Sequence, residues 1–542
     1  MKLERIEISG FRGIRRLSLS LDELTVLIGE NAWGKSSLLD ALSLSLNPDG
    51  ELYQFEKKDF HIDHTLGNDQ FTQLQIVLRW QESFSGENRA RRYRQFAPVW
   101  NGNNGGLRQI DYRVSATLED NKVDTEWDFL DIEGNICDIE NKQELAIALM
   151  RLHPIIRMRD SRWLRNNNED ERKRNTRLER RLANTARRLE LMPGHVNKGE
   201  IRSGFRAMRT LLDHYFAFDK ENPENRIIDP YRHLNMSSSN IHPLEVVAMN
   251  TSNHSRLLLM GMLNTFIRGR GPRQLKSNAR PVFIFEDPEG RLHPTLLSQA
   301  WRLIQIMPMQ KVITTNSGDL LSSVPLTSIR RLERGPTHTQ TFQVPQRKLG
   351  ANEMRKIAFH VRIHRPSALF ARCWLLVEGE TEVWLFSELA RLKGYDLSAE
   401  GVNIIEFAQS GLKPLIKVAK ALGIQWHLIA DGDPAGQKYA HTARSMLDGD
   451  SEMHRLTVLP TEDIERFLFD NGYSELFREM AGILEDEKIS PRKIISKAVK
   501  RFAKPDAALA IVAYTENQKA GEVPVLLRRT LQRVISMARG IG

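Results

Sequence analysis

The segment Leu24–Lys35 restricts the fold of this chain more than any other. It reads LTVLIGENAWGK, an unbroken apolar run that ends at Gly29 and a loop that closes with Gly34 and Lys35. An unbroken apolar run is typical of a strand buried on both faces in a parallel sheet. The residues that begin at Lys35, KSSLLDALSLSL, have the apolar spacing of a helix. We therefore predict a strand, a loop and a helix in succession, within an α/β fold.

The loop between that strand and helix matches the pattern G-x-x-x-x-G-K-[ST] through Gly29, Gly34, Lys35 and Ser36. In this pattern backbone N–H groups surround phosphate oxygens, the lysine reaches the β- and γ-phosphates, and the serine hydroxyl binds Mg²⁺. A place between a buried strand and a helix N-terminus favours a phosphate site over an accidental glycine-rich turn. The expected nucleotide contacts are Asn31, Gly34, Lys35, Ser36 and Ser37, with Ser36 also a Mg²⁺ ligand.

A second apolar run, PVFIFEDPE, ends in acidic residues. Glu286 stands where an acid that supports a nucleotide-bound metal ion is expected, and Asp287 stands where a general base for water is expected. An ordinary acidic loop after a strand is the alternative. Because the phosphate pattern is also present, we predict that Glu286 is a metal ligand and that Asp287 is a catalytic residue.

Three stretches resemble ABC-type ATPases of the SMC and Rad50 group. FEDPEGRLHP and KVITTNSGDLL are similar to late motifs of that class, and TSNHSRLLLM is similar to a degenerate signature motif that contains Ser252. In that class two ATPase units enclose two ATP molecules, and each signature motif faces the nucleotide of the other unit. The resemblance therefore implies ATP as a cofactor and Ser252 as a nucleotide contact.

The chain departs from that class at two positions. Asn316 stands where a histidine is expected, and Asp287 stands where a glutamate is usual. Asparagine has no imidazole, and aspartate is one methylene shorter than glutamate, so the attacking water would be held less well. We therefore expect slow hydrolysis, with ATP acting as a switch.

Carboxylates also follow two later apolar runs. In LLVEGETEVWLF the run ends at Glu378, and in WHLIADGDPAG it ends at Asp431, with Asp433 two positions on. The ends of parallel strands meet at one edge of a sheet, where sites in open α/β sheets usually lie. Grouped carboxylates repel one another unless a cation neutralises them, and hard divalent ions prefer oxygen ligands. We predict a metal site, and carboxylates with a structural role are the alternative.

The combination of VEG…E with a later DGD resembles a TOPRIM domain, which serves topoisomerases, primases and several nucleases. The resemblance implies that Glu378 is an acid/base group and that Asp431 and Asp433 bind Mg²⁺ or Mn²⁺. Glu382, and Glu465 from the acidic cluster LPTEDIERFL, would complete a two-metal arrangement. For Glu465, an acid on a helix surface is the alternative.

Two further residues near these motifs receive different roles. Lys504, in FAKPDAALA, is matched to a later lysine that stabilises phosphate and is included as a catalytic residue. Glu380, which lies between Glu378 and Glu382, is expected to be a turn or cap residue.

An ABC-type ATPase followed by TOPRIM on one chain resembles the OLD (overcoming lysogenization defect) family, ATP-dependent endonucleases of bacteria and phages. The resemblance spans nearly the whole chain and implies a homodimer that cleaves DNA with a divalent metal, in DNA repair or phage defence. The expected fold is α/β, with an ABC/SMC-like ATPase domain, a helical insert, a TOPRIM domain and a helical C-terminal tail. The expected divisions are 1–150 and 236–348 for the ATPase, 151–235 for the insert, 349–473 for TOPRIM and 474–542 for the tail.

The segment from Ile155 to Glu190 is dense in arginine and has a thin apolar stripe of leucines. We predict long exposed helices here. A solvated helical face or dimer arm explains this charge, and a phosphate-binding surface is the alternative. Sustained heptads are missing from the segment, in contrast to the coiled-coil inserts of SMC and Rad50 proteins.

The composition limits the partners and the location. The 542 residues carry a net charge of +10 with a pI near 9.5, which favours an anionic partner such as DNA. Two cysteines are too few for a disulfide framework or a zinc site. No apolar run approaches the roughly 20 residues needed to span a bilayer, and Glu4 and Glu7 stand where a secretion signal would be apolar. We expect a cytoplasmic protein without membrane contact.

Three other functions remain open from the sequence. The chain could be an ATPase sensor or scaffold with a silent TOPRIM site that recruits an effector. It could be a primase or topoisomerase, but nothing supports Tyr439 or Tyr473 as the nucleophile that strand passage needs. It could also be a nuclease that acts on RNA or responds to a ligand. The sequence does not show whether ATP activates or inhibits cleavage.

Overall fold

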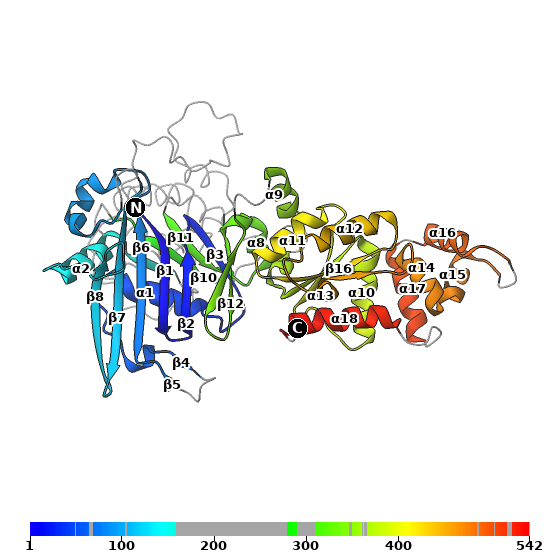
Figure 1. Cartoon of the computed structure of the whole chain (residues 1–542), viewed down its shortest axis with the longest axis horizontal. Helices are drawn as coiled ribbons and strands as arrows, with labels where there is room; N and C mark the ends of the chain where they lie inside the picture. The colour runs from blue at the N-terminus through cyan, green and yellow to red at the C-terminus, as the bar shows by residue number, and fades with distance from the viewer. Residues whose placement is uncertain are drawn as a thin grey trace, which may run out of the picture. The chain divides into compact units, whose positions relative to one another are not determined.

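The computed structural model of the chain divides into two compact units (Figure 1). Unit 1 comprises 1–324 and 328–341, and unit 2 comprises 325–327 and 342–542. Ser252 and nearly all of the expected insert lie outside the described residues. The structure describes residues 1–48, 50–63, 69–102, 106–158, 279–289, 301, 309–345, 350–359, 361, 366–484, 487–502, 504–517 and 523–540.

Unit 1 is built on an eleven-stranded sheet with the order β8-β7-β6-β1-β2-β13-β12-β3-β11-β10-β9. The strands are β1 (Lys2–Phe11), β2 (Ile14–Ser20), β3 (Leu24–Ile28), β6 (Gln73–Gln81), β7 (Gln109–Glu119), β8 (Lys122–Leu130), β9 (Ile155–Met158), β10 (Val282–Glu286), β11 (Gln310–Thr314), β12 (Ile329–Arg334) and β13 (Thr339–Gln343). A separate pair is formed by β4 (Ile62–Asp63) and β5 (Asp69–Gln70). Among the described residues of this unit, the α-helices are α1 (Lys35–Ser45), α2 (Lys142–Leu152) and α8 (Gly318–Ser323).

The sheet of unit 1 has an antiparallel part and a parallel part. Strands β8, β7, β6, β1 and β2 pair antiparallel, and Figure 1 shows them side by side. Buried residues alternate along β6, as expected for a strand with one face in a core. Strands β12, β3, β11, β10 and β9 pair parallel, and the predicted strand Leu24–Ile28 is buried almost throughout. The parallel part therefore brings the ends of β3 and β10 to one edge.

The structure corrects the sequence analysis at the start of the arginine-rich segment. Residues Ile155–Met158 form strand β9 and pair in parallel with β10, whereas long exposed helices were predicted from Ile155 onward. Ile155 and Ile156 are buried in the sheet, which explains the strand. The prediction for the residues after Met158 lies outside the described part of the chain.

Unit 2 contains a four-stranded parallel sheet with the order β15-β14-β16-β17. The strands are β14 (Cys373–Val377), β15 (Val402–Glu406), β16 (Gln425–Ala430) and β17 (Leu456–Val458). The helices are α9 (Ala351–Ile357), α10 (Glu380–Leu392), α11 (Leu412–Ala421), α12 (Pro434–Arg444), α13 (Glu452–Arg455), α14 (Ile464–Leu468), α15 (Ser474–Ala481), α16 (Pro491–Arg501), α17 (Lys504–Glu516) and α18 (Val525–Ala538). Strands β14 and β16 are the two inner strands, and both are buried almost throughout.

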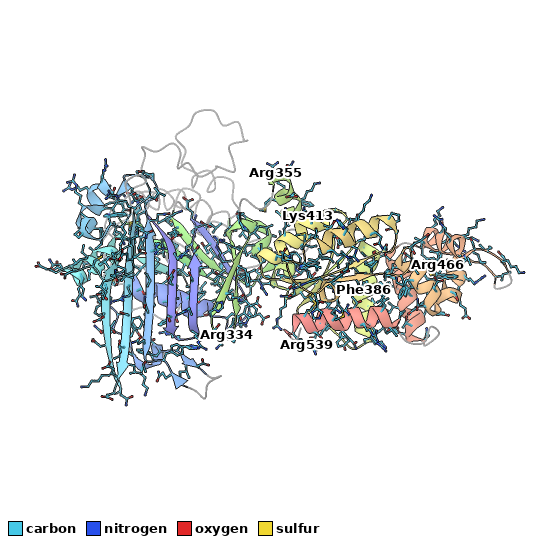
Figure 2. All side chains as sticks on the ribbon, viewed as in Figure 1. Arg334, Arg355, Phe386, Lys413, Arg466 and Arg539 are labelled. Atoms are coloured by element: carbon cyan, nitrogen blue, oxygen red, sulfur yellow. The ribbon has the colours of Figure 1, made fainter. Side chains whose placement is uncertain are left out.

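The C-terminal helices of unit 2 share one hydrophobic core with its sheet. That core contains Leu375 and Ile404 from the sheet, Phe386 from α10, and Leu527 and Leu531 from α18. Phe386, labelled in Figure 2, is fully buried. Helix α17 packs along α10. The helical tail is therefore part of the same folded body as the sheet.

None of the described helices is long and apolar enough to cross a membrane.

Candidate functional site

The phosphate loop connects β3 to α1 in the backbone shape that its glycines permit. Gly34 has φ 96° and stands directly before α1, and Ala32 also has a positive φ of 68°. A Cβ added to Gly34 would lie 3.0 Å from Cγ1 of Ile14, so a larger residue would be strained in both conformation and space. The loop therefore closes against β2 and leads into the N-terminus of a helix, where an anion is favoured.

Lys35 is held inside the loop by neutral oxygens. Its Nζ donates to the carbonyl oxygen of Gly29, and to Oδ1 of Asn316 at 3.2 Å. Burial lowers the pKa of Lys35, and the charges of Asp287, Glu289 and Glu30 oppose this shift in that order. Because its hydrogen-bond acceptors are a carbonyl and an amide oxygen, phosphate oxygens can replace them. Asn316, at the position expected to hold a histidine, thus contacts the phosphate-binding lysine.

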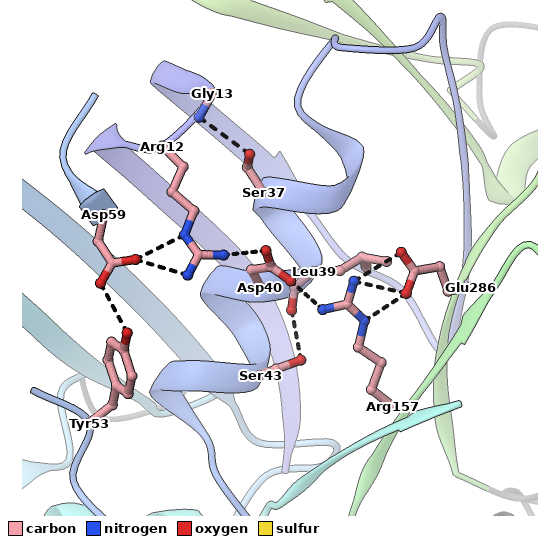
Figure 3. Close-up of polar contacts among 10 residues, drawn as sticks. All are labelled: Arg12, Gly13, Ser37, Leu39, Asp40, Ser43, Tyr53, Asp59, Arg157 and Glu286. Atoms are coloured by element: carbon pink, nitrogen blue, oxygen red, sulfur yellow. Dashed lines mark hydrogen bonds and ion pairs between the residues drawn. The ribbon is translucent and has the colours of Figure 1, made fainter. Parts of the chain in front are cut away.

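The other predicted residues of the loop lie at its surface or along α1. Asn31 and Ser36 are exposed. Ser37 accepts a hydrogen bond at its Oγ from the backbone N–H of Gly13 at 3.3 Å, as Figure 3 shows. This contact ties α1 to the turn between β1 and β2. Asn31 thus lies in the loop, Gly34 directly precedes α1, and Lys35, Ser36 and Ser37 form its first turn; their contacts with a nucleotide stay predictions.

A cavity of about 290 Å³ opens beside this turn. Arg15 pairs with Asp63 there at 2.9 Å, and Arg334, labelled in Figure 2, contributes a second guanidinium. Gly13 links the cavity to the phosphate loop, because its N–H bonds to Ser37. No local sequence pattern marks this cavity, since its walls come from three separate segments. The lining residues are Gly13, Arg15, His61, Asp63, Arg334, Gly335, Pro336, His338 and Thr339.

Glu286 ends β10 and is held by an arginine that the sequence analysis did not single out. Arg157, on β9, donates from Nε and Nη2 to the two carboxylate oxygens of Glu286, each at 2.9 Å. Its Nη1 donates to Asp40 of α1, and Arg12 donates to the other oxygen of Asp40 (Figure 3). The signal for Arg157 was hidden, because it begins an arginine-rich stretch that was assigned to exposed helices.

Asp287 lies beyond the end of β10 and is fixed by the neighbouring strand β11. Its φ is 42°, its N–H donates to the carbonyl oxygen of Thr314 at 3.1 Å, and Thr314 Oγ1 donates to its carboxylate at 3.2 Å. Glu289 accepts from Thr315 Oγ1 at 2.8 Å and from the N–H of Asn316 at 2.7 Å. The acids of PVFIFEDPE therefore face the segment that also supplies Asn316 to Lys35.

The second acidic edge lies at the carboxyl ends of β14 and β16. These strands are parallel neighbours, with Leu376 opposite Leu428, so Glu378 and Asp431 follow them at the same edge of the sheet. Asp433 caps α12, accepting from the N–H of Gly436 at 2.6 Å. Glu382 lies in the first turn of α10, which begins two residues after Glu378. The predicted carboxylates thus come from two strand ends and two helix starts.

Gly432 brings a third acidic segment to this edge. Its N–H donates to the carbonyl oxygen of Thr461 at 2.9 Å, and a Cβ added there would lie 2.3 Å from that oxygen. The close approach places the start of α14 next to Asp431, and with it Asp463 and Glu465. Asp463 is itself the N-cap of α14 and accepts from the N–H of Arg466 at 2.7 Å.

The carboxylates at this edge raise one another's pKa values. The pKa of Asp431 is raised to about 8, mainly by burial and then by the charges of Glu382, Glu378, Glu465 and Asp463 in that order. Burial also raises the pKa of Glu378, with Glu382 and Asp433 as the next causes. All five predicted acids therefore belong to one electrostatic group, and the group holds excess negative charge.

The chemistry of this donor set fits a divalent cation. Carboxylate oxygens are the ligands that Mg²⁺ and Mn²⁺ prefer, and a bound cation would relieve the repulsion that raises the pKa of Asp431. Across the residues that the structure describes, no three His, Cys, Asp or Glu side chains stand close enough together to hold a metal ion. The carboxylates therefore influence one another electrostatically, but the described side chains are not gathered around a single metal position.

Tyr439 adds a phenol to the acidic edge. Its ring packs edge-on against Phe407 with centroids 4.8 Å apart, and Phe407 N donates to Val377, the residue before Glu378, at 3.0 Å. Burial raises the pKa of Tyr439, followed by the charges of Glu378 and Asp433, so the phenol keeps its proton. The hydroxyl of Tyr473, in contrast, bonds to Thr515 inside the core.

Two further predicted residues stand apart from the carboxylate group. Lys504 is the first residue of α17, but its side chain lies outside the described part of the structure, so its role stays a prediction. Glu380 is exposed in the first turn of α10, which agrees with a role in the helix start.

Comparison with known proteins finds family matches for two parts of the chain. Residues 1–368 match the family described as "Protein of unknown function (DUF2813)", and 369–433 match the TOPRIM domain of overcoming lysogenization defect-like proteins. "Uncharacterized protein YbjD" of Escherichia coli (strain K12) is 43% identical over 554 residues, which cover all of both chains. Glu378, Glu382, Asp431 and Asp433 lie inside the TOPRIM match.

Two solved structures resemble parts of the chain more distantly. The C-terminal region of the Burkholderia pseudomallei OLD protein is 17% identical, with 31% of this chain and 99% of that chain covered and a TM-score of 0.26. The Smc head domain of Pyrococcus furiosus is 12% identical, with 66% and 99% covered and a TM-score of 0.35. The family assignment rests on the sequence matches. The chain belongs to the DUF2813 family, and its residues 369–433 match the TOPRIM domain of the OLD-like proteins.

Proposed function

We propose that the chain is an ATP-binding and ATP-hydrolysing, divalent-metal-dependent DNA endonuclease. The observation that carries this proposal is the group of five carboxylates at the carboxyl edge of the unit 2 sheet, whose mutual repulsion contributes to the raised pKa of Asp431. The net charge of +10 supports an anionic substrate. By its resemblance to OLD proteins, the chain acts as a cytoplasmic homodimer in DNA repair or phage defence.

In unit 1 the phosphate loop would bind ATP. Lys35 would exchange the oxygens of Gly29 and Asn316 for phosphate oxygens, and Ser36 would reach the Mg²⁺ that accompanies the nucleotide. The cavity beside Gly13 has the position to take the nucleoside part, because Gly13 bonds directly to Ser37 of α1. Asp287 is anchored on Thr314 and would orient the attacking water. Since Asp287 is short and Asn316 cannot act as an imidazole, hydrolysis is slow and ATP serves as a switch.

In unit 2 the five carboxylates would hold the metal. Divalent ions bound there activate water and stabilise the leaving oxygen of a phosphodiester. The ligands would be Glu382, Asp431, Asp433 and Glu465, and Glu378, whose pKa is raised, would hold or release a proton. Lys504 would stabilise the phosphate. Tyr439, which stays protonated, offers an O–H donor at the same edge.

Cleavage of supercoiled plasmid by the full chain tests this proposal. We expect nicking with Mg²⁺ or Mn²⁺, little with Ca²⁺, and a rate that changes when ATP is added. Asp431→Ala combined with Asp433→Ala removes the activity, whereas Glu380→Gln, an exposed acid in the same segment, leaves it unchanged. Cleavage that persists in the double variant would reject the acidic edge as the active site, and cleavage of RNA alone would change the substrate class.

A second candidate function has one observation in its favour. Among the described residues no three acids come close enough to close around a metal ion, as a silent site would show. In that case the chain is an ATPase sensor or scaffold that recruits an effector. Titration of the full chain with Mn²⁺ separates the two functions. Binding that is lost in Asp431→Ala favours the nuclease, and absence of both binding and cleavage favours the scaffold.

A further inference from the structure

The carboxylates of Asp40 and Glu286 are joined by a single guanidinium. Arg157 contacts both oxygens of Glu286 at 2.9 Å and one oxygen of Asp40, and we call this Asp40–Arg157–Glu286 arrangement the Arg157 bridge (Figure 3). Its three members come from α1, β9 and β10, which are separate in sequence. The bridge therefore connects the helix behind the phosphate loop with the strand that carries the metal-supporting acid.

The bridge is well shielded from solvent. The side chain of Arg157 is 10% exposed, and those of Asp40 and Glu286 are each 21% exposed. A guanidinium donates in a fixed plane, so a two-point contact fixes the orientation of a carboxylate as well as its distance. Loss of the arginine would leave two shielded carboxylates without the cation between them, which is costly.

The far side of Asp40 is held as well. Arg12 donates to its second oxygen and also to Asp59, at 2.9 Å from Nε. Asp59 in turn accepts from the hydroxyl of Tyr53 at 3.0 Å. Asp40 therefore cannot turn away from Arg157, and Arg157 is aimed at Glu286 by an acid that is itself immobilised.

We propose that Arg157 is a positioning residue for the metal ion that accompanies the nucleotide. It fixes both oxygens of Glu286 relative to α1, so that the acid and the phosphate loop form one preset unit for Mg²⁺ and phosphates. This inference rests on the proposed binding of Mg²⁺–ATP in unit 1. It predicts that Arg157 acts only when the metal is present and acts through Glu286.

Nucleotide affinity with and without metal tests this role. The full-length protein is titrated with a fluorescent ATP analogue in EDTA and in Mg²⁺, and the ratio of the two dissociation constants gives the benefit from Mg²⁺. We expect Arg157→Gln to reduce this benefit at least tenfold and to leave the affinity in EDTA within about twofold. Glu286→Gln gives the same loss, and the double variant loses no more than Glu286→Gln alone, because residues that act as one unit are not additive.

Two further variants separate positioning from general stability. Arg113→Gln removes a matched ion pair of the same sheet, in which Arg113 contacts Asp128 at 2.7 Å and is similarly shielded, and it leaves the Mg²⁺ benefit unchanged. Arg157→Lys keeps the positive charge and loses the two-point contact. We expect Arg157→Lys to have the melting temperature of the wild type and still to lose most of the Mg²⁺ benefit. If Arg157→Gln fails to fold, Arg157→Lys therefore tests the positioning role in its place.

The outcomes distinguish this inference from the proposed function. A wild-type protein that binds no nucleotide overturns both. A wild-type protein with a clear Mg²⁺ benefit that Arg157→Gln and Arg157→Lys retain overturns the positioning role alone. Equal loss of affinity in EDTA and in Mg²⁺ also overturns it, because the bridge would then serve only to hold the fold together.

Discussion

Asp431→Asn should stabilise the protein when no metal is bound. The pKa of Asp431 is raised to about 8 in the folded chain, first by burial and then by the neighbouring carboxylates. An aspartate in an unfolded chain has a pKa of about 3.9. The folded state therefore opposes ionisation of this group, and an asparagine of the same shape removes the conflict. Activity would be lost at the same time, as is common when a strained site is relieved.

The size and pH dependence of this gain follow from the two pKa values. Taken in full, their difference corresponds to about 5–6 kcal/mol, but Asp431 is partly exposed, and solvent screening reduces the gain to about 1–2 kcal/mol. The unfolded chain loses its proton near pH 4 and the folded chain near pH 8. The advantage of Asp431→Asn is thus absent near pH 4, grows through this interval and is complete above pH 8.

Thermal unfolding in EDTA at pH 5 and pH 8.5 measures the effect. At pH 8.5 the midpoint of the unit 2 transition should rise by about 3–6 °C, and at pH 5 the rise should be much smaller. Asp450→Asn, which removes an exposed carboxylate that pairs with Arg455, should show no such dependence on pH. Adding Mn²⁺ should make the wild type melt at a higher temperature than Asp431→Asn, since only the wild type keeps the carboxylate that binds the ion. A variant no more stable than wild type at pH 8.5 would refute the reasoning.

Three other outcomes are expected. Lys35→Ala should abolish ATP binding, as measured by calorimetry, while Mn²⁺ binding at Asp431 persists. If the nuclease activity of Lys35→Ala equals that of the wild type at every ATP concentration, ATP does not control cleavage. The affinity for Mn²⁺ should increase as the pH rises toward 8 and then level off, because the ion competes with the proton on Asp431. Binding should therefore release a proton. A Mn²⁺ affinity that does not change from pH 6 to 8 would contradict this. Gly432→Ala should abolish cleavage yet retain ATP binding, because its Cβ would lie 2.3 Å from the Thr461 carbonyl oxygen.

Sequence patterns located the residues whose roles depend on local chain geometry. Gly34 and Lys35 follow an apolar strand and begin a helix, and that order alone predicts a phosphate loop. Glu378 and Asp431 each follow an apolar run, and the parallel pairing of β14 with β16 brings them to one edge as predicted. In these cases the neighbouring residues specify the element, and the element specifies where the side chain lies.

Sequence patterns did not reveal the roles of residues that depend on distant partners. Arg157 lies in a stretch of arginines, and only the pairing of β9 with β10, more than a hundred positions later, shows that it belongs to the sheet. The approach of Asp463 to Asp431 depends on Gly432 contacting Thr461 across a loop. Such contacts leave no periodic pattern, because they are set by how strands are ordered in the sheet.

The common core of the unit 2 sheet and its C-terminal helices sets the smallest piece of this protein that can be inherited or exchanged as a working module. The TOPRIM match ends at Asp433, whereas Leu527 and Leu531 of α18 still pack against the strands that present the acids. A recombination event that transferred only the matched segment would leave the apolar faces of β14 and α10 uncovered. Gene fusions that carry this activity intact should therefore have their junctions before β14 and after α18.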